Sequence, residues 1–121
     1  MHLKLLLLTA CLTSLLACQK TNDKNPALLG KWQGKEWLIF DKPSSMDATQ
    51  VQFEFKADGG YSAQFGNQNQ SGIWRSENDK LYTTESGKQE IMVKILKLDT
   101  STLSFEMNRG GQKETLTLAK Q

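Results

Sequence analysis

The sequence predicts an all-β protein, a small up-and-down antiparallel β-barrel of about eight strands, preceded by a cleaved signal peptide. Apolar and polar side chains alternate from Gly30 onward, most clearly from Val51 to Lys56, and this alternation is typical of half-buried strands. Turn signals recur roughly every 8 to 12 residues, a spacing that favours a sandwich or a barrel. No stretch of about ten residues with helical periodicity interrupts these predicted strands.

The first residues form the predicted signal peptide, residues 1–17. Lys4 supplies a positive charge, and the apolar run from Leu5 to Leu16 is shorter than the roughly 20 residues that span a bilayer. The run ends on Ala17-Cys18, which resembles the bacterial lipoprotein signal, in which cleavage occurs just before a lipid-carrying cysteine. An ordinary secretory peptide with a chance cysteine is the alternative. "LTAC", ending at Cys11, matches less well because it leaves a shorter apolar core.

Lipid attachment at Cys18 predicts a protein anchored in the bacterial cell envelope, most simply in the outer membrane. Several acyl chains, such as palmitate, on one cysteine would make the anchor durable, whereas a single chain binds only marginally. Gln19 gives no sign of inner-membrane retention. Residues 18–26 are then a lipidated, flexible tether, and residues 27–121 form the barrel domain.

Removal of the signal peptide excludes several kinds of catalysis. It takes away His2, the only histidine, and Cys11, which leaves Cys18 as the one cysteine. The mature chain then has no imidazole or thiolate for a Ser-His-Asp, Cys-His or zinc site. We therefore expect no enzyme, no metal and no cofactor. The net charge falls from +2 to +1 without Lys4, and no basic stripe is present, so nucleic acid is not an expected partner.

The barrel domain begins with a short helical turn and continues as strands. Asn25 is the predicted cap of this turn and Pro26 its first residue, and the turn would pack under the fold as a plug. The predicted strands are residues 32–40, 51–56, 61–65, 71–76, 80–84, 91–98, 103–107 and 115–118. Asp58-Gly59 is a strong hairpin signal because Asp-Gly accepts positive φ angles. Since nearly every connection is hairpin-short, we expect a meander, and closure would remove its two edges.

Four stretches carry a family resemblance: "LLGKWQG", "FEFKADGGYSAQF", "SGIWRSENDKLY" and "LSFEMNRGGQKETLTLAK". They are similar to the compact lipocalin-like lipoproteins of Bacteroidetes-type bacteria, over about residues 27–120. The resemblance implies that Trp32 closes one end of the barrel and that a basic residue near the last strand packs across it. Lys113, Lys120 or Arg109 would take that role. The Gly-x-Trp repeat at Gly72 leaves the biotin-binding barrels as an alternative relative.

Strand parity assigns a set of side chains to the barrel interior: Trp32, Ile39, Val51, Phe53, Phe55, Tyr61, Ala63, Phe65, Trp74, Leu81, Ile91, Val93, Ile95, Leu103, Phe105, Met107, Leu116 and Leu118. Eight strands enclose a space that side chains can just fill or that holds one small ligand, so a packed core and a cavity both stay open.

A cavity, if present, would have Tyr61, Phe65, Trp74 and Met107 as its apolar wall. Residues 41–50 form the longest loop, which is either a lid at the cavity mouth or a solvated connector.

Two carboxylates, Glu36 and Glu114, share the parity of the inward set. Such a pair can perform acid–base chemistry when burial separates the two pKa values. Both lie near strand ends, where an inward carboxylate can still reach water, and we interpret them as structural. Arg75 and Arg109 are interpreted as solvated residues of the outer face.

The sequence therefore predicts an envelope-anchored, non-enzymatic, lipocalin-like monomer that binds a small apolar ligand. The Thr-Asp-Tyr-type motif of the larger lipocalins is missing, which argues against their mode of ligand carriage. A protein-interaction module, an inhibitor or accessory subunit with a packed interior, is the alternative. Its contact surface would include the exposed ends "FGNQNQSG" and "NRGGQKE".

Overall fold

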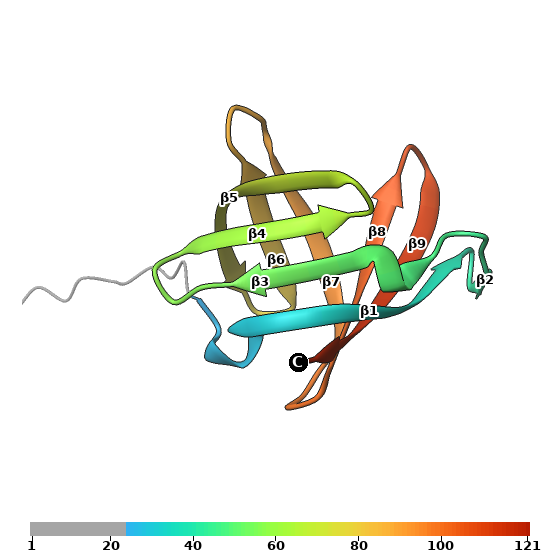
Figure 1. The fold of residues 1–121 in the computed structure, drawn as a ribbon, viewed down its shortest axis with the longest axis horizontal. Coiled ribbons are helices and arrows are strands. Elements are labelled where there is room, and N and C mark those ends of the chain that lie inside the picture. Colours follow the sequence, from blue (N-terminus) through green and yellow to red (C-terminus); the bar gives the residue numbers. More distant parts are fainter. Residues whose placement is uncertain (1–23) are drawn as a thin grey trace, which may run out of the picture.

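The alternating side chains fold into a meander of antiparallel strands, seen in a computed structural model that describes residues 24–121 (Figure 1). The predicted signal peptide, Cys18 and most of the tether lie outside the described residues. Within them the strands are β1 (Gly30–Ile39), β2 (Lys42–Pro43), β3 (Val51–Phe55), β4 (Gly60–Phe65), β5 (Gln68–Glu77), β6 (Lys80–Glu85), β7 (Glu90–Leu98), β8 (Thr102–Arg109) and β9 (Gln112–Lys120). Two short 3-10 helices, η1 (Pro26–Leu28) and η2 (Ala48–Gln50), precede β1 and β3.

The meander closes into a barrel through its first and last strands. Successive strands pair in order from β3 to β9, and β1 pairs with both β3 and β9. The β1–β9 register runs from Trp32↔Lys120 to Ile39↔Glu114. The predicted eight-stranded barrel is therefore confirmed, and closure leaves no long unpaired edge between its first and last strands. The two-residue strand β2 is an addition that pairs with the end of β1.

Two turns are shorter than predicted, so their strands are longer. β5 begins at Gln68 because the β4–β5 turn needs only Gly66 and Asn67. β8 and β9 meet at Gly110-Gly111, where both residues have positive φ. Such angles suit glycine, which lets strand pairing extend to the edge of a two-residue turn.

Two strands of the barrel, β5 and β1, change their pairing partner along their length. The first part of β5 pairs with β4 and the second part with β6, and the change occurs at Gly72. β1 changes partner in the same way near Gly34. A Cβ atom at Gly72 would clash with the carbonyl oxygen of Thr84, and one at Gly34 with that of Ala48. Glycine at these corners permits the close approach of two backbones.

A β-bulge in β1 reverses which side chains face inward. The register with β9 shifts between Gly34 and Glu36, which inserts one residue. Trp32 faces inward before the bulge, and Trp37 does so after it. Glu36 is exposed on the outer wall, so the prediction that its parity points it inward is wrong.

Aromatic rings occupy the middle of the interior. The Phe53 ring lies 5.6 Å from Phe55, 5.6 Å from Phe65 and 5.9 Å from Phe105, measured between centroids. Phe55 in turn lies 5.3 Å from Trp74. Buried aliphatic side chains of β6, β8 and β9 complete this core: Leu81, Leu103, Leu116 and Leu118. Most of the predicted inward set is therefore confirmed as core.

The N-terminal turn covers one end of the barrel, which we call the plug end. The predicted cap is confirmed, because Asn25 Oδ1 accepts a hydrogen bond of 2.9 Å from the Ala27 backbone N–H. Leu28 is completely buried, and its carbonyl accepts a bond of 2.9 Å from Trp32 Nε1. The opposite end, where the β4–β5, β6–β7 and β8–β9 turns lie, is called the mouth.

Candidate functional site

The plug end is sealed by a tryptophan and a lysine. Trp32 is completely buried, and Lys120 Nζ lies 4.8 Å from the centroid of its ring. The same ammonium donates a hydrogen bond of 2.7 Å to the Leu29 carbonyl. Lys120 is thus the basic residue that lies over the first-strand tryptophan. Lys113 instead forms an ion pair of 3.1 Å with Asp41.

The barrel wall divides at the mouth. The register between β7 and β8 begins at Lys94↔Glu106, although each strand continues beyond this pair toward its turn. Within residues 24–121, positions 90–93 of β7 pair only with β6, and positions 107–109 of β8 pair only with β9. The β6–β7 and β8–β9 hairpins accordingly separate toward their tips (Figure 1). Backbone pairing between β7 and β8 is therefore absent at this end of the barrel.

Inward side chains near this division remain accessible to solvent. Ile91 lies opposite Thr83 and two positions from Val93, which is opposite the buried Leu81, so strand alternation directs it inward. Its side chain is nevertheless 58% exposed. The prediction that Ile91 is a buried core residue is therefore wrong, because β8 does not pair with β7 at this position. Phe65, Val93 and Met107 are partly buried beside the core.

A buried carboxylate lies at the mouth. Glu114 is 3% exposed, and Oε1 accepts a hydrogen bond of 2.7 Å from Trp37 Nε1. Its second oxygen accepts one of 2.7 Å from Gln112 Nε2, and Arg109 Nη1 lies 3.4 Å from Oε1. Hydrogen bonds from such donors offset the desolvation penalty of a buried carboxylate. Its donors leave little room for a further ligand.

Arg109 is the accessible member of this cluster. Its side chain is 55% exposed, and its Cζ atom lies 6.0 Å from the centroid of the Trp37 ring. Among residues 24–121, Glu114 is the one hydrogen-bond partner of its guanidinium group, which carries five N–H donors. The prediction that Arg109 belongs to the solvated outer face is wrong, because the longer β8 strand places it beside the inward carboxylate.

The four predicted wall residues separate into two pairs. Tyr61 and Trp74 are buried in the core, where the Tyr61 hydroxyl donates to Gln70 Oε1 at 2.8 Å. Burial raises the pKa of Tyr61 above its ordinary value. Phe65 and Met107 lie at the mouth, partly exposed. Contact of any of the four with a ligand stays a prediction.

The long loop packs against β1, and its residue Ala48 belongs to the hydrophobic core cluster. Residues 41–50 contain β2 and η2, and Ala48 of η2 is buried against β1. Ser44 Oγ donates to the Trp37 carbonyl at 2.6 Å, and Gln33 Nε2 donates to the Thr49 carbonyl at 2.7 Å. Asp47 caps η2, and the hydrogen bonds from Thr49 hold the pKa of Asp47 below its ordinary value.

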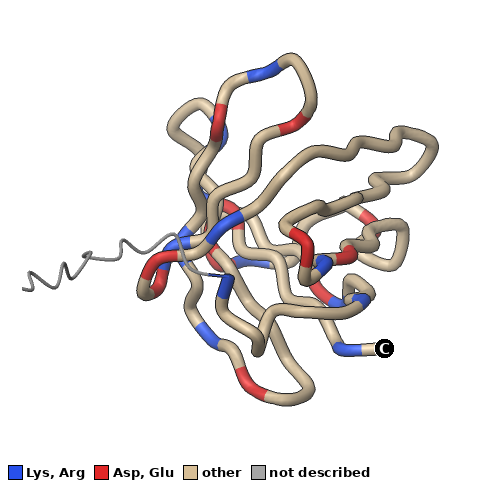
Figure 2. The backbone as a smooth tube through the Cα atoms, turned by 90° about the vertical axis from the view of Figure 1, so that its left-hand side faces the viewer, with Lys and Arg blue, Asp and Glu red and all other residues tan. Residues whose placement is uncertain are grey.

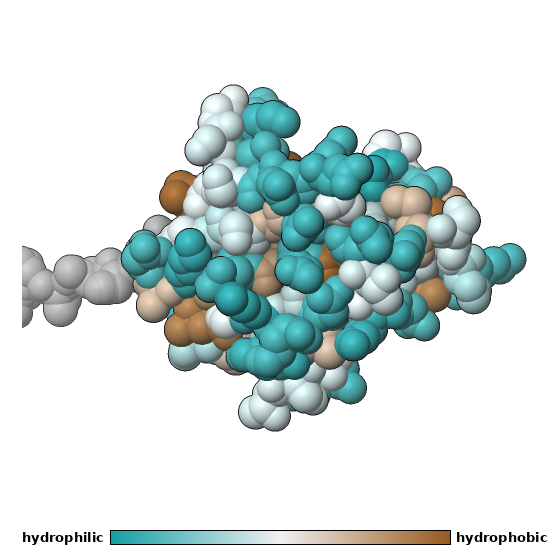
Figure 3. Space-filling view, in the orientation of Figure 1, coloured by the Kyte–Doolittle hydropathy of each residue, from teal (hydrophilic) through white to brown (hydrophobic). Residues whose placement is uncertain are grey.

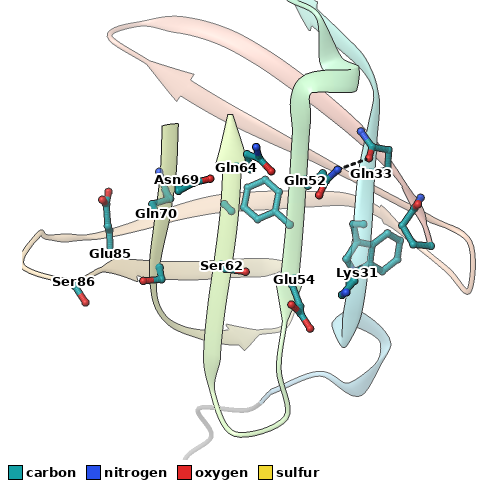
Figure 4. Close-up of a pocket in the computed structure, with 15 residues that line it drawn as sticks. Lys31, Gln33, Gln52, Glu54, Ser62, Gln64, Asn69, Gln70, Glu85 and Ser86 are labelled. Atoms are coloured by element: carbon teal, nitrogen blue, oxygen red, sulfur yellow. Dashed lines mark hydrogen bonds between the residues drawn. The ribbon is translucent and has the colours of Figure 1, made fainter. Parts of the chain in front are cut away.

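A second concave surface lies on the outer wall. A hollow of about 630 Å³ covers β1, β3, β4 and β5, and Figure 4 shows the polar side chains that line it. Its lining includes Gln33, Gln52, Gln64 and Asn69, which point away from the barrel interior. Sequence parity marks Gln33, Gln52 and Gln64 as outward, whereas Asn69 lies in a predicted turn, and nothing in the sequence distinguishes a hollow from a flat solvated face.

The charges are distributed without a dominant patch. Lys and Arg alternate with Asp and Glu over the described backbone (Figure 2), which does not provide the basic footprint of a nucleic-acid interface. The part of the chain that the structure describes contains no group of three or more His, Cys, Asp or Glu side chains placed to hold a metal. Over the same residues, 24–121, none of the helices has the length and hydrophobicity to cross a membrane.

Comparisons with known proteins agree with this geometry. The family model for the lipocalin-like domain matches residues 28–105. The fold is similar to the crystal structure of a lipocalin-like protein from Bacteroides uniformis ATCC 8492, with a TM-score of 0.56 and 19% sequence identity. That alignment covers 74% of this chain and 96% of the other. No curated protein sequence matches this chain significantly.

Proposed function

The chain belongs to the family of lipocalin-like domains, and from this premise we propose that it is a non-enzymatic binding protein for small amphipathic anions. The ligand would bind at the mouth, with its apolar part between β7 and β8 and its anionic head beside Arg109. This proposal rests on one observation: at the mouth, inward-facing Ile91 of β7 is exposed, and the Arg109 guanidinium of β8 has donors without a partner within residues 24–121.

The packed aromatic core favours a shallow site over a deep one. The Phe53 ring packs against Phe105 in the core and against Phe65 nearer the mouth, and the interior beyond Phe53 is buried. A ligand that remained at the mouth would need to displace none of these rings. Met107, Val93 and Ile91 offer it an apolar surface there. Ligand sites commonly combine such a surface with a few polar anchors.

We expect the head group of the ligand to be an anion, because the accessible charge at the mouth is the positive charge of Arg109. Glu114 is buried and already accepts from Trp37 and Gln112, so a cationic ligand would find it occupied. Arg109 is exposed, and its contact with Glu114 is long for a charge-assisted hydrogen bond. A carboxylate can pair with the remaining donors of Arg109 in a bidentate geometry.

The proposal also includes attachment to the cell envelope through lipid on Cys18, most simply in the outer membrane. It is supported by the apolar run that ends on Ala17-Cys18, and this segment lies outside the described residues. An anchored protein would meet amphiphiles that partition into the membrane. Mass spectrometry of the mature chain, purified from a native-type host, should show a diacylated or triacylated Cys18 and no residues 1–17.

The binding proposal is tested by displacement of a fluorescent fatty-acid probe from a soluble chain that begins at Gln19. Laurate should displace the probe about tenfold more effectively than dodecanol or dodecylamine, since a hydrogen bond to a charged group contributes about 1.5 kcal/mol or more. Arg109→Met should remove that preference and leave dodecanol binding unchanged. Arg75→Met is the matched control, because Arg75 lies on the outer wall, and it should keep the preference.

Equal displacement by all three amphiphiles, or loss of the laurate preference in the Arg75 variant, would contradict an anion site at the mouth. Failure of the probe to bind at all would remove the ligand-binding proposal. The experiment therefore distinguishes a protein that binds no such ligand from one that binds it without the predicted contact to Arg109.

A protein-interaction module is the second candidate, and one surface favours it. Ile73 and Met92 on the outer wall are 64% and 49% exposed. On the same strands the Arg75 guanidinium lies 3.8 Å from the centroid of the Tyr82 ring and is hydrogen-bonded to Glu90 through two contacts of 3.0 Å. Tyr, Arg and Met are enriched in protein interfaces. If a stable envelope partner exists, Met92→Asp should abolish its co-purification, and Ile91→Asp at the mouth should not.

A further inference from the structure

The hollow on the outer wall is distinct from the mouth in both position and chemistry. It lies over the sheet formed by β1, β3, β4 and the first part of β5, on the face opposite the core. Its volume of about 630 Å³ falls in the range of small-molecule sites, roughly 300–1,000 Å³. The proposed anion site uses none of its lining side chains.

Both sides of this hollow are held in place by backbone hydrogen bonds. On one side Ser86, just after β6, donates its N–H to the Ser71 carbonyl at 3.0 Å. On the other side the terminal Gln121 donates its N–H to the Lys31 carbonyl at 2.8 Å. Both Ser86 and Gln121 line the hollow. Ser86 and Gln121, which directly follow strands β6 and β9, are thus fixed to β5 and β1 by backbone hydrogen bonds.

The floor carries side-chain amides with a defined orientation. Gln33 Nε2 donates to the carbonyls of Thr49 and Val51, at 2.7 Å and 3.2 Å. Its Oε1 accepts from Gln52 Nε2 at 3.1 Å, the bond drawn in Figure 4. Gln52 is thus positioned by Gln33, while its own Oε1 has no partner within residues 24–121 and is available to a ligand. Gln64 and Asn69 extend this row across β4 and β5 (Figure 4).

The charges of the hollow exclude several classes of ligand. Its charged lining residues are Lys31, Glu54 and Glu85, one cation and two anions, and the face over β3 and β4 is mainly hydrophilic (Figure 3). Nucleic acids need several cationic contacts, which this surface does not supply. Protein hot spots need aromatic or Arg anchors, whereas Trp32 and Phe53 of the lining are buried toward the core.

We propose that this outer hollow binds a neutral glycan chain. Primary amides and hydroxyl groups each both donate and accept hydrogen bonds, so a row of Gln, Asn and Ser side chains matches a polymer of uncharged hydroxyl groups. The near balance of charge makes such a ligand preferable to an anionic or cationic one. Waters can bridge those hydroxyl groups that do not reach a side chain directly.

The test uses the full chain, purified from membranes in a polyoxyethylene detergent, since sugar detergents would compete. Maltohexaose, cellohexaose, mannohexaose and chitohexaose are titrated separately while side-chain amide resonances are followed by NMR. At least one glycan should shift the signals of Gln52, Gln64 and Asn69 in a saturable way. Gln52→Ala and Asn69→Ala should each weaken that glycan about fivefold, the effect of losing one hydrogen bond.

Gln89→Ala is the matched control, because Gln89 is an exposed glutamine that does not line the hollow. It should leave glycan affinity within about twofold of the parent, since surface changes away from a site are usually small. The proposal is overturned if none of the four glycans shifts these amides, or if the control weakens binding as much as Gln52→Ala. Saturable shifts from a neutral hexapeptide but from no glycan would also overturn it, in favour of a protein partner.

The two sites are separable in the same preparation. Gln52→Ala should leave laurate binding unchanged, and Arg109→Met should leave glycan binding unchanged. Loss of both activities in either variant would show that the two surfaces are not independent, which would overturn the assignment of a separate glycan site.

Discussion

The two ends of the barrel each pair a tryptophan of β1 with a cation, yet they differ in what the cation can still do. At the plug end Lys120 lies 4.8 Å from the Trp32 ring and donates to a carbonyl of the N-terminal turn. At the mouth Arg109 lies 6.0 Å from the Trp37 ring and is more than half exposed. One cation completes a seal, and the other retains donors for a ligand.

A single inserted residue lets β1 supply an inward tryptophan at each end of the barrel. The bulge between Gly34 and Glu36 lets one strand direct Trp32 to the plug end and Trp37 to the mouth, both facing inward. At the plug end, η1 covers the tryptophan, and Leu28 accepts its indole N–H. At the mouth, strands β7 and β8 part and no helix of residues 24–121 covers the opening as η1 does. This difference supports our proposal that the mouth, and not the plug end, is the binding end of the barrel.

The largest difference should be in stability. Trp32→Ala should lower the free energy of unfolding by about 3–5 kcal/mol, because it leaves a large cavity at a completely buried position. Trp37→Ala should cost less, because its surroundings at the mouth can relax and water can enter. Urea denaturation of both variants measures this difference. Equal losses would mean that the mouth is packed as tightly as the plug end.

Removal of the buried carboxylate should have an intermediate effect. Glu114→Ala leaves the buried Trp37 indole N–H without its acceptor, which costs about 1–3 kcal/mol, whereas the partly buried Gln112 amide can turn to water. Part of this cost is recovered because Arg109 is exposed and can be solvated. Thermal and urea unfolding check the value. Glu114→Gln is the control, since it keeps an acceptor, and it should cost less than Glu114→Ala.

Lys120 should contribute more than Arg109 to stability, and Arg109 should contribute more than Lys120 to ligand binding. Lys120→Met should cost about 1–2 kcal/mol, because it removes both a cation–π contact and a hydrogen bond to the Leu29 carbonyl. Arg109→Met should cost less than about 1 kcal/mol, as expected of an exposed ion pair. Chemical denaturation of the two variants distinguishes them. A larger loss for Arg109→Met would contradict the division of roles.

The smallest effect should appear at high pH. Burial raises the pKa of Tyr61 in the folded state, so its phenol stays protonated where the unfolded chain, with a pKa of about 10, begins to ionise. Stability is therefore retained below about pH 10 and falls as pH rises through the folded pKa. Absorbance at 295 nm should show a tyrosine that ionises late, and Tyr61→Phe should remove that phase. An unchanged titration curve in the variant would assign the late phase elsewhere.

Strands, turns and the closed end were accessible to sequence reasoning because each has a local signal. Alternation locates the strands, Asp58-Gly59 marks a hairpin, and Asn25-Pro26 marks the turn that becomes the plug. The family resemblance adds Trp32 and a set of three basic residues that contains Lys120. These signals depend on neighbouring residues, which is why they are visible without the fold.

The mouth was not predictable in the same way. The bulge inserts Lys35, and no sequence signal marks that insertion. Strand parity therefore assigns Glu36 to the interior and overlooks Trp37. Arg109 looks like a turn residue until the tight turn at Gly110-Gly111 extends β8 past it. The parting of β7 and β8 is a property of the closed barrel, and alternation alone therefore buries Ile91. The outer hollow likewise depends on sheet shape and not on any local pattern.

The central claim, that the mouth receives a ligand while the plug end is sealed, is tested most directly by methyl NMR during a laurate titration. The account predicts saturable shifts for the methyl groups of Ile91 and Met107 and none for those of Leu28 and Leu103, which are completely buried. Unmoved signals at Ile91 and Met107, or equal shifts at Leu28 and Leu103, would contradict it.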